Sequence, residues 1–292
     1  MASPERFDPY NQFLFAPDKS SGSTSVRPDV LNRLEQAVGQ IQDSETFRRY
    51  LDVQARFHKY SWGNVALILM QRPDATLVAG YNAWLKMHRF VRKGERGVRI
   101  IVPMRRKENE EESEEETKLF FGTGIVFDVS QTEGEPLPEV DVPVLQGDEG
   151  RDLLARLEEL AGKEGVSVRW TNEGLPDGAM GVYVPSQRRI VVREATTLQM
   201  TKTLAHELAH HFGAMDWSAS ENESIAESVA YVVCGHFGLD TGARSFPYIA
   251  LWSKEPKVLK RVLTTVQKVS AKIIDRVEGN NKKSDETDLL SS

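Results

Sequence analysis

Residues 204–210 read Leu-Ala-His-Glu-Leu-Ala-His, inside a longer segment whose residue types favour a helix. Because His206 and His210 are four residues apart, both imidazoles lie on one helix face, one turn from each other, as two ligands of a single metal ion must. Glu207 lies beside that face and can reach a water at the metal as a general base. The stretch predicts a metal-binding helix. An amphipathic helix with ordinary histidines is the alternative.

A catalytic zinc site needs a third protein ligand. The next helix opens with residues 221–227, and Ser218 and Glu221 have the spacing of a capping box at its start. Glu223 and Glu227 are four residues apart, so both carboxylates face one way. We predict Glu223 as the metal ligand and Glu227 as the acceptor of the second ring N–H of a ligating histidine. The reverse assignment stays open, because the spacing determines only their common face.

Three other residues are weaker candidates for the third ligand. Cys234 lies on an apolar helix face, where a buried and inert thiol is expected. His211 points about 100 degrees away from the metal face, because it directly follows His210. His236 is a candidate by residue type alone.

The rest of the chain mixes helical and β-like patterns. Apolar residues recur at helical spacing in residues 26–59, 64–70 and 153–160, whereas residues 76–80, 98–102, 125–129 and 166–170 read as short strands. Residues 181–192 read as a hairpin, and three further helices are expected over about 197–212, 219–237 and 255–277. The pattern predicts an α+β protein with two domains.

Composition suggests where the two domains meet. Pro136, Pro138 and Pro143 stand among acidic residues and read as an extended connection. We predict loose tails over 1–25 and 279–292, an N-terminal α+β domain over 26–132, a linker over 133–149 and a second domain over 150–278.

The motif of His206, Glu207 and His210, followed by Glu223 and Glu227, resembles the gluzincin pattern of the zincin metallopeptidases. The resemblance implies a zincin-like (gluzincin) metallopeptidase domain with Glu207 as the catalytic residue and one Zn²⁺ per chain, for which Mn²⁺ or Co²⁺ could substitute. It also implies an edge strand in the hairpin 181–192 that binds an extended peptide. A tyrosine commonly stabilises the oxyanion in such enzymes, and the candidates are Tyr183, Tyr231 and Tyr248.

A basic segment lies in the N-terminal half. Residues 86–107 contain nine Lys or Arg residues against one acid, Glu95, and they are interleaved with aromatic residues that could stack on bases. A solvated basic surface around core aromatics is the alternative. Residues 108–116, which carry seven glutamates, are predicted to form an exposed loop that competes with nucleic acid for this segment.

Residues 60–64, 73–81, 91–98 and 126–132 are similar to the N-terminal domain of ArdC-type antirestriction proteins. That family joins this domain to a zincin-like one, and the resemblance spans roughly residues 26–278. It implies binding of single-stranded DNA and protection of incoming plasmid or phage DNA from host restriction. The residues we predict to contact DNA are Trp62, Asn64, Tyr81, Trp84, Arg89, Arg92, Lys93, Arg96 and Arg99. Ile225 departs from the family pattern, which often has an acid there.

Composition bounds the remaining possibilities. The 292 residues carry 37 Lys plus Arg and 43 Asp plus Glu, a net charge of -6. No apolar run approaches the roughly 20 residues of a membrane span, and no signal peptide is visible, so we expect a cytoplasmic protein without a membrane partner. The single cysteine excludes an internal disulfide.

Three functions remain open. The first is a DNA-associated zinc metalloendopeptidase that acts in antirestriction and cuts an unidentified protein on DNA. The second is a single-stranded DNA-binding module with a non-catalytic zinc domain. The third resembles the ImmA/IrrE peptidases, which cleave a repressor, and would not explain residues 60–132. The general base Glu207 favours the first, because a structural zinc site needs none. The oligomeric state is not indicated.

Overall fold

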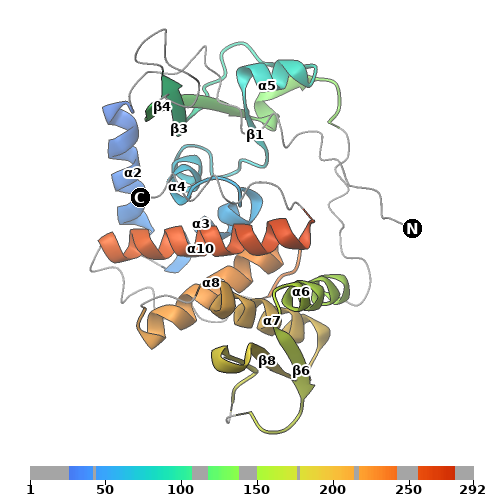
Figure 1. Cartoon of the computed structure of the whole chain (residues 1–292). Coiled ribbons are helices and arrows are strands. Elements are labelled where there is room, and N and C mark those ends of the chain that lie inside the picture. The colour runs from blue at the N-terminus through green and yellow to red at the C-terminus, as the bar shows by residue number, and fades with distance from the viewer. Residues whose placement is uncertain are drawn as a thin grey trace. The chain divides into compact units, whose positions relative to one another are not determined.

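The computed structural model describes residues 26–41, 44–106, 118–137, 150–175, 178–213, 217–241 and 256–279 (Figure 1). The chain divides into two compact units. The first unit comprises Met1–Gln40 and Gly63–Val140, and the second comprises Ile41–Trp62 and Asp141–Ser292. The structure mixes helices with strands, so the predicted α+β class is confirmed. Among the described helices, none is long and apolar enough to cross a membrane.

The first unit is built around a small antiparallel sheet of order β1-β4-β3. A second, two-stranded sheet pairs β2 with β5. The elements of this unit are α2 (Pro28–Gln40), β1 (Val78–Gly80), α5 (Tyr81–Lys86), β2 (Arg89–Val91), β3 (Val98–Arg106), β4 (Lys118–Asp128), η2 (Val129–Gln131) and β5 (Thr132–Gly134). Helix α4 (Trp62–Gln71) belongs to this unit as well, except for its first residue, Trp62, which is grouped with the second unit. Because β5 pairs with β2, residues 133 and 134 belong to a sheet and not to the predicted linker.

Asp128 holds the end of β4 against β1. Its buried carboxylate accepts the backbone N–H groups of Thr76 at 2.8 Å and of Leu77 at 3.1 Å, and it also accepts that of Ser130. Burial would raise the pKa of Asp128, but the hydrogen bonds from Ser130, Thr76 and Leu77 outweigh it and lower that pKa. The carboxylate therefore stays charged and satisfied inside the unit.

Two amide side chains of α4 cover the open edge of β3. The Nδ2 of Asn64 donates to the carbonyl of Ile101 at 2.7 Å, and its Oδ1 accepts the N–H of Ile101 at 2.8 Å. Gln71 makes the same pair of hydrogen bonds with the backbone of Arg99. These amides take the place of a neighbouring strand. The prediction that Asn64 contacts DNA is therefore wrong, since its buried side chain is committed to the β3 backbone.

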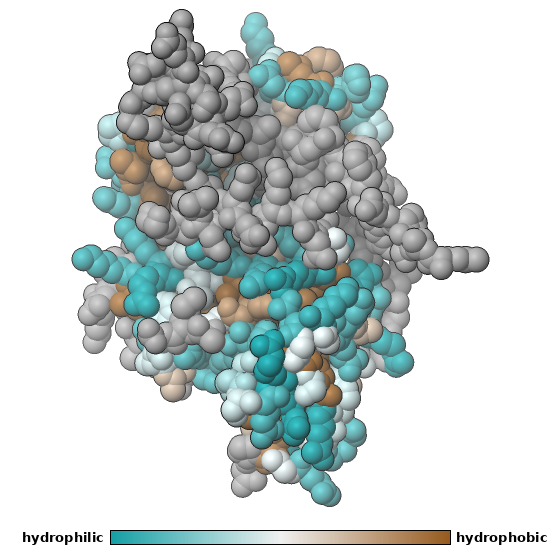
Figure 2. Space-filling view, viewed as in Figure 1, coloured by the Kyte–Doolittle hydropathy of each residue, from teal (hydrophilic) through white to brown (hydrophobic). Residues whose placement is uncertain are grey.

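The second unit contains helices around a three-stranded sheet of order β6-β8-β7. Strands β6 and β8 are parallel, and β7 and β8 form the predicted antiparallel hairpin. The elements are α3 (Ser44–Arg56), α6 (Arg151–Lys163), β6 (Ser167–Thr171), β7 (Gly181–Val184), η3 (Pro185–Gln187), β8 (Arg189–Arg193), α7 (Thr197–Phe212), α8 (Ala219–His236) and α10 (Pro256–Val277). The surface seen over β6 and β8 is mostly hydrophilic, as expected for a sheet face in water (Figure 2).

Helix α7 lies at the centre of this unit, in contact with α6, α8 and the strands β7 and β8. Its apolar residues Leu204 and Leu208 are fully buried, as are Val229 and Val233 of α8. Helix α3 packs against α8. This packing explains why residues 41–62 group with the second unit, although the sequence places them in the N-terminal domain. Their apolar face, which includes Phe47 and Leu51, is buried there.

The predicted capping box at the start of α8 is present. The hydroxyl of Ser218 accepts the N–H of Glu221, and the Glu221 carboxylate accepts the N–H of Ser218 at 2.8 Å. The predicted tails at 1–25 and 280–292, linker residues 138–149 and the acidic segment 108–116 lie outside the described residues.

We predict that Asn64→Ala destabilises the first unit, because the N–H and carbonyl of Ile101 lose their partners. The expected loss is about 1–3 kcal/mol in the free energy of unfolding, measured by urea denaturation. Asn32→Ala is the matched control, since Asn32 is exposed on α2. Equal stability of the two variants would show that the amide does not support β3.

Candidate metal centre

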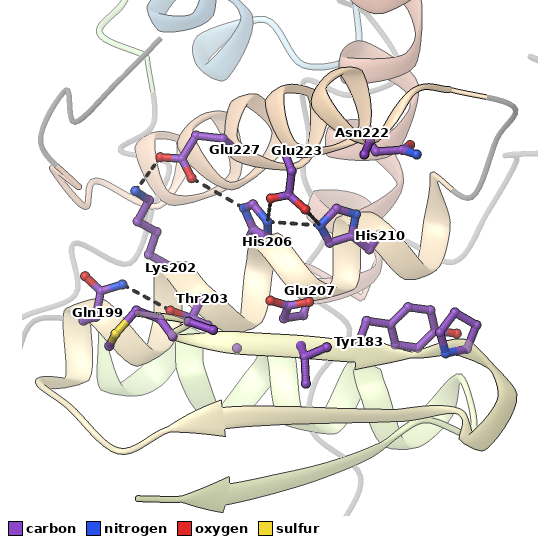
Figure 3. Close-up of a pocket in the computed structure, with 16 residues that line it drawn as sticks. Tyr183, Gln199, Lys202, Thr203, His206, Glu207, His210, Asn222, Glu223 and Glu227 are labelled. Carbon is purple, nitrogen blue, oxygen red and sulfur yellow. Dashed lines mark hydrogen bonds and ion pairs between the residues drawn. The ribbon is translucent and has the colours of Figure 1, made fainter. Parts of the chain in front are cut away.

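Helix α7 positions the two histidines of the motif. Their Nε2 atoms lie 3.1 Å apart, and their ring centroids are separated by 4.8 Å (Figure 3). The side chains of His206 and His210 are 17% and 21% exposed. Two imidazole nitrogens thus point to one place at the edge of a pocket.

Helix α8 brings Glu223 to the same place (Figure 3). Its Oε2 lies 3.3 Å from Nε2 of His206, and its Oε1 lies 3.5 Å from Nε2 of His210. One ligand atom from each of the three residues falls within 4.8 Å of the others. Two imidazoles and one carboxylate at this spacing are the donor set of many catalytic zinc sites.

Glu227 contacts the opposite nitrogen of His206. Its Oε2 lies 3.4 Å from Nδ1 of His206, and its Oε1 pairs with Nζ of Lys202 at 2.5 Å. A carboxylate in this position orients the ring and leaves Nε2 available. Lys202 was not among the residues predicted from the sequence. Its position four residues before His206 on the same helix face was the signal for it.

The charges in this cluster support one another. Burial lowers the pKa of His206, but hydrogen bonds to Glu223 and Glu227 outweigh it and raise that pKa to about 9. The hydrogen bonds from His206 and His210 in turn hold the pKa of Glu223 far below its usual range. Glu223 is therefore an anion at neutral pH, as a metal ligand must be.

Glu207 lies on the pocket wall between α7 and β7, and it is 5% exposed. Burial raises its pKa, and the charges of His206 and His210 and the backbone N–H of Tyr183 oppose that shift. A carboxylate with a raised pKa is suited to accept and return a proton near neutral pH.

Gly181 on β7 allows the strand to pass close to α7. A Cβ added there would lie 2.6 Å from Cγ2 of Thr203 and 2.8 Å from Oε1 of Glu207. A larger residue would therefore displace Glu207 or the strand. Nothing in the sequence pattern singled out this glycine, because its role depends on a contact between distant segments.

The pocket has a volume of about 1080 Å³ and opens between α7, α8 and β7. His206, Glu207, His210, Glu223 and Glu227 line it, together with Tyr183. In the described part of the sheet, β7 pairs with β8 on one side only, and its residues 181–183 line the pocket. A polypeptide in extended conformation could pair with that free edge.

The three tyrosines considered for the oxyanion lie in different environments. The Tyr183 hydroxyl is 2.8 Å from Nδ1 of His211, at the pocket. Tyr231 faces α3, where its hydroxyl donates to Asp52 at 2.6 Å, so its candidacy is wrong. Tyr248 lies outside the described residues.

Of the predicted DNA-contacting residues, several are committed to the fold. Trp84 is fully buried and its Nε1 donates to the carbonyl of Phe127, so the prediction that it stacks on a base is wrong. Arg89 binds the hydroxyl and carbonyl of Thr132. Arg92 donates to the carbonyl of Ser130, and Arg99 pairs with Asp29 at 2.9 Å.

The remaining residues of that set are accessible. Tyr81 is 44% exposed, Lys93 and Arg96 are exposed, and Trp62 is partly exposed at the start of α4. Phe90 on β2, one of the aromatic residues interleaved with the basic segment, is 53% exposed. Exposed aromatic and basic side chains in one segment are the combination that binds single strands.

Residues 24–127 match the family model of the N-terminal domain of anti-restriction factor ArdC. The chain is also 26% identical to an uncharacterized protein of Bacillus anthracis, in a match that covers 74% of this chain. The match covers only 44% of the relative's length, so this chain spans less than half of that protein.

Two solved structures of ArdC from plasmid R388 share the fold. The Mn(II)-bound structure aligns with a TM-score of 0.56 at 19% identity, covering 86% of this chain and 99% of that chain. The metal-free structure gives 0.51 at 21% identity, covering 76% and 86%. Residues 24–127 therefore match the ArdC N-terminal domain, and the described part of the chain shares the fold of the R388 ArdC structures, which together support an ArdC-type protein.

Proposed function

We propose that the chain is an antirestriction protein that binds single-stranded DNA through its ArdC N-terminal domain and carries a divalent-metal peptidase site in its second, zincin-like domain. The observation that carries the proposal is the convergence of His206, His210 and Glu223 beside the buried Glu207. The match of residues 24–127 to the ArdC N-terminal domain supports the DNA-binding part. Protection of incoming plasmid or phage DNA is the corresponding biological role, and a cytoplasmic location fits it.

The residues fit a divalent transition metal. Two imidazole nitrogens and one carboxylate oxygen suit Zn²⁺, and Mn²⁺ and Co²⁺ accept the same donors. The similar ArdC of plasmid R388 is known in a Mn(II)-bound structure, which supports a divalent ion here. When bound, such an ion would act as a Lewis acid toward a substrate carbonyl and a water.

Different residues of the chain would then have different roles in peptide hydrolysis. Glu207 would take a proton from the attacking water and return it to the leaving amine, for which its raised pKa is suited. Glu227, held by Lys202, would keep the His206 ring in orientation. The free edge of β7 would pair with the substrate backbone beside Tyr183.

The protein substrate would be an unstructured segment, because an extended chain is what a free strand edge binds. A DNA-binding module with a non-catalytic metal domain is the second candidate. The observation that favours it is that exposed aromatic and basic residues lie together in one segment, where they could bind DNA without any peptidase activity. Hydrolysis separates the two candidates.

We predict that Glu223→Gln weakens binding of Zn²⁺ to the pocket by at least ~100-fold, because it removes a charged ligand. Isothermal titration of the metal-free full chain measures the affinity. Glu159→Gln is the control, since Glu159 is an exposed carboxylate of the same unit on α6. Unchanged affinity in Glu223→Gln would remove Glu223 from the ligand set.

We predict that Glu207→Gln abolishes hydrolysis and keeps the metal. The amide cannot accept the proton, so cleavage should fall by about 10²–10⁴-fold. The test incubates the Zn²⁺-loaded protein with a library of proteome-derived peptides and counts new termini by mass spectrometry. Metal content measured on the same sample is the control. Cleavage by the variant at the wild-type rate would contradict the role of Glu207, and no cleavage by either protein would favour the second candidate.

We predict that Lys93→Ala with Arg96→Ala weakens binding to single-stranded DNA. Loss of two phosphate contacts should reduce the slope of log affinity against log salt by roughly 1.4, at about 0.7 per contact. Fluorescence anisotropy with an oligothymidine at several salt concentrations measures the slope. Arg33→Ala, an exposed cation on α2, should leave it unchanged. A slope equal to that of the wild type would place the DNA elsewhere.

A further inference from the structure

A second group of ligating side chains lies in the second unit, outside the pocket lining. It consists of His58, just after α3, His236, the last residue of α8, and Glu278, directly after α10. One ligand atom from each residue lies within 4.8 Å of the others. Three chain segments that are far apart in sequence thus meet at this point.

The hydrogen-bond partners of His236 imply a positive charge at its Nε2 atom. Its Nδ1 lies 2.9 Å from the carbonyl oxygen of Ala55, which can only accept, so Nδ1 carries a proton. Its Nε2 lies 2.9 Å from Oε1 of Glu278. In the neutral ring with a proton on Nδ1, the Nε2 lone pair would face a carboxylate. Either a second proton or a cation must therefore lie at Nε2.

His58 provides an independent sign of a missing ligand. It is 7% exposed, and neither of its ring nitrogens has a hydrogen-bond partner among the described residues. The buried Oδ1 of Asp275 also has no such partner, and it lies 3.6 Å from Nε2 of His58. Nδ1 of His58 has no such contact, and because buried polar atoms are rarely left in this state, a further group that binds this ring is expected here.

We propose that His58, His236 and Glu278 bind one divalent transition-metal ion. Two imidazoles and one carboxylate suit Zn²⁺. Ala55 accepts the second ring N–H of His236, which is the usual way that a ligating histidine is oriented. Because the three donors come from segments at the ends of α3, α8 and α10, such an ion would cross-link these ends.

The inference does not depend on the proposed peptidase function. The two candidate metal sites share no residue, and different variants remove them. The competing explanation for the second cluster is an imidazolium of His236 paired with Glu278, with no metal ion. It leaves Nδ1 of His58 without a hydrogen-bond partner among the described residues, and Nε2 of His58 with only the 3.6 Å contact to Asp275.

Metal counting on the full untagged chain tests the inference. The protein is stripped with a chelator, reloaded with Zn²⁺, desalted and analysed by mass spectrometry for zinc. With both sites filled, the wild type should hold about two ions, Glu278→Gln about one, Glu223→Gln about one and the double variant none. The control Glu173→Gln, an exposed acid of the same unit, should hold about two.

The counts separate the two sites. One ion in the wild type that Glu223→Gln removes and Glu278→Gln retains would overturn the second site alone. One ion in the wild type that Glu278→Gln removes and Glu223→Gln retains would support the second site and contradict the first. If Glu278→Gln proves unfolded by circular dichroism, His236→Gln takes its place, with an expected loss of affinity of at least ~10-fold.

Thermal unfolding gives a second readout. In the Glu223→Gln background, saturating Zn²⁺ should raise the melting temperature by several degrees, because a ligand that binds only the folded chain stabilises it. That shift should disappear when Glu278→Gln is added. A shift that persists in the double variant would show that the ion binds elsewhere.

Discussion

The contact between α7 and α8 is the constraint on which the rest of the second unit depends. Charged groups are costly to bury unless they are paired. His206 and His210 from one helix therefore share Glu223 from the other, while Glu227 pairs with both His206 and Lys202. The buried apolar residues around them hold the helices at the distance at which these side chains meet.

Helix α8 links the two clusters of ligating residues. Glu223 lies near its beginning and His236 at its end, a separation of 13 residues, or about 20 Å along an ideal helix. On our account, the ion at the far end restrains α8 where α3 and α10 end. The helix that presents Glu223 would then be held at both ends. Such support from outside the pocket keeps ligand geometry within the narrow limits that metal chemistry needs.

The local patterns of the sequence predicted much of this structure. The spacing of His206 and His210, the capping box at Ser218 and the hairpin of β7 and β8 all depend on residues close in sequence. The residues that sequence reasoning placed wrongly depend on tertiary packing. Trp84 stands in a basic segment but fills the core, and Asn64 bonds to a strand 37 residues away. Residue type alone cannot distinguish an exposed aromatic from a buried one.

The most direct test of the central claim is anomalous diffraction at the zinc edge from crystals of the Zn²⁺-loaded protein. The account predicts a peak about 2.0–2.2 Å from Nε2 of His206, Nε2 of His210 and a carboxylate oxygen of Glu223. Glu207 should lie outside bonding distance of the ion. A peak that does not include these three ligands, or no peak between α7 and α8, would contradict the account.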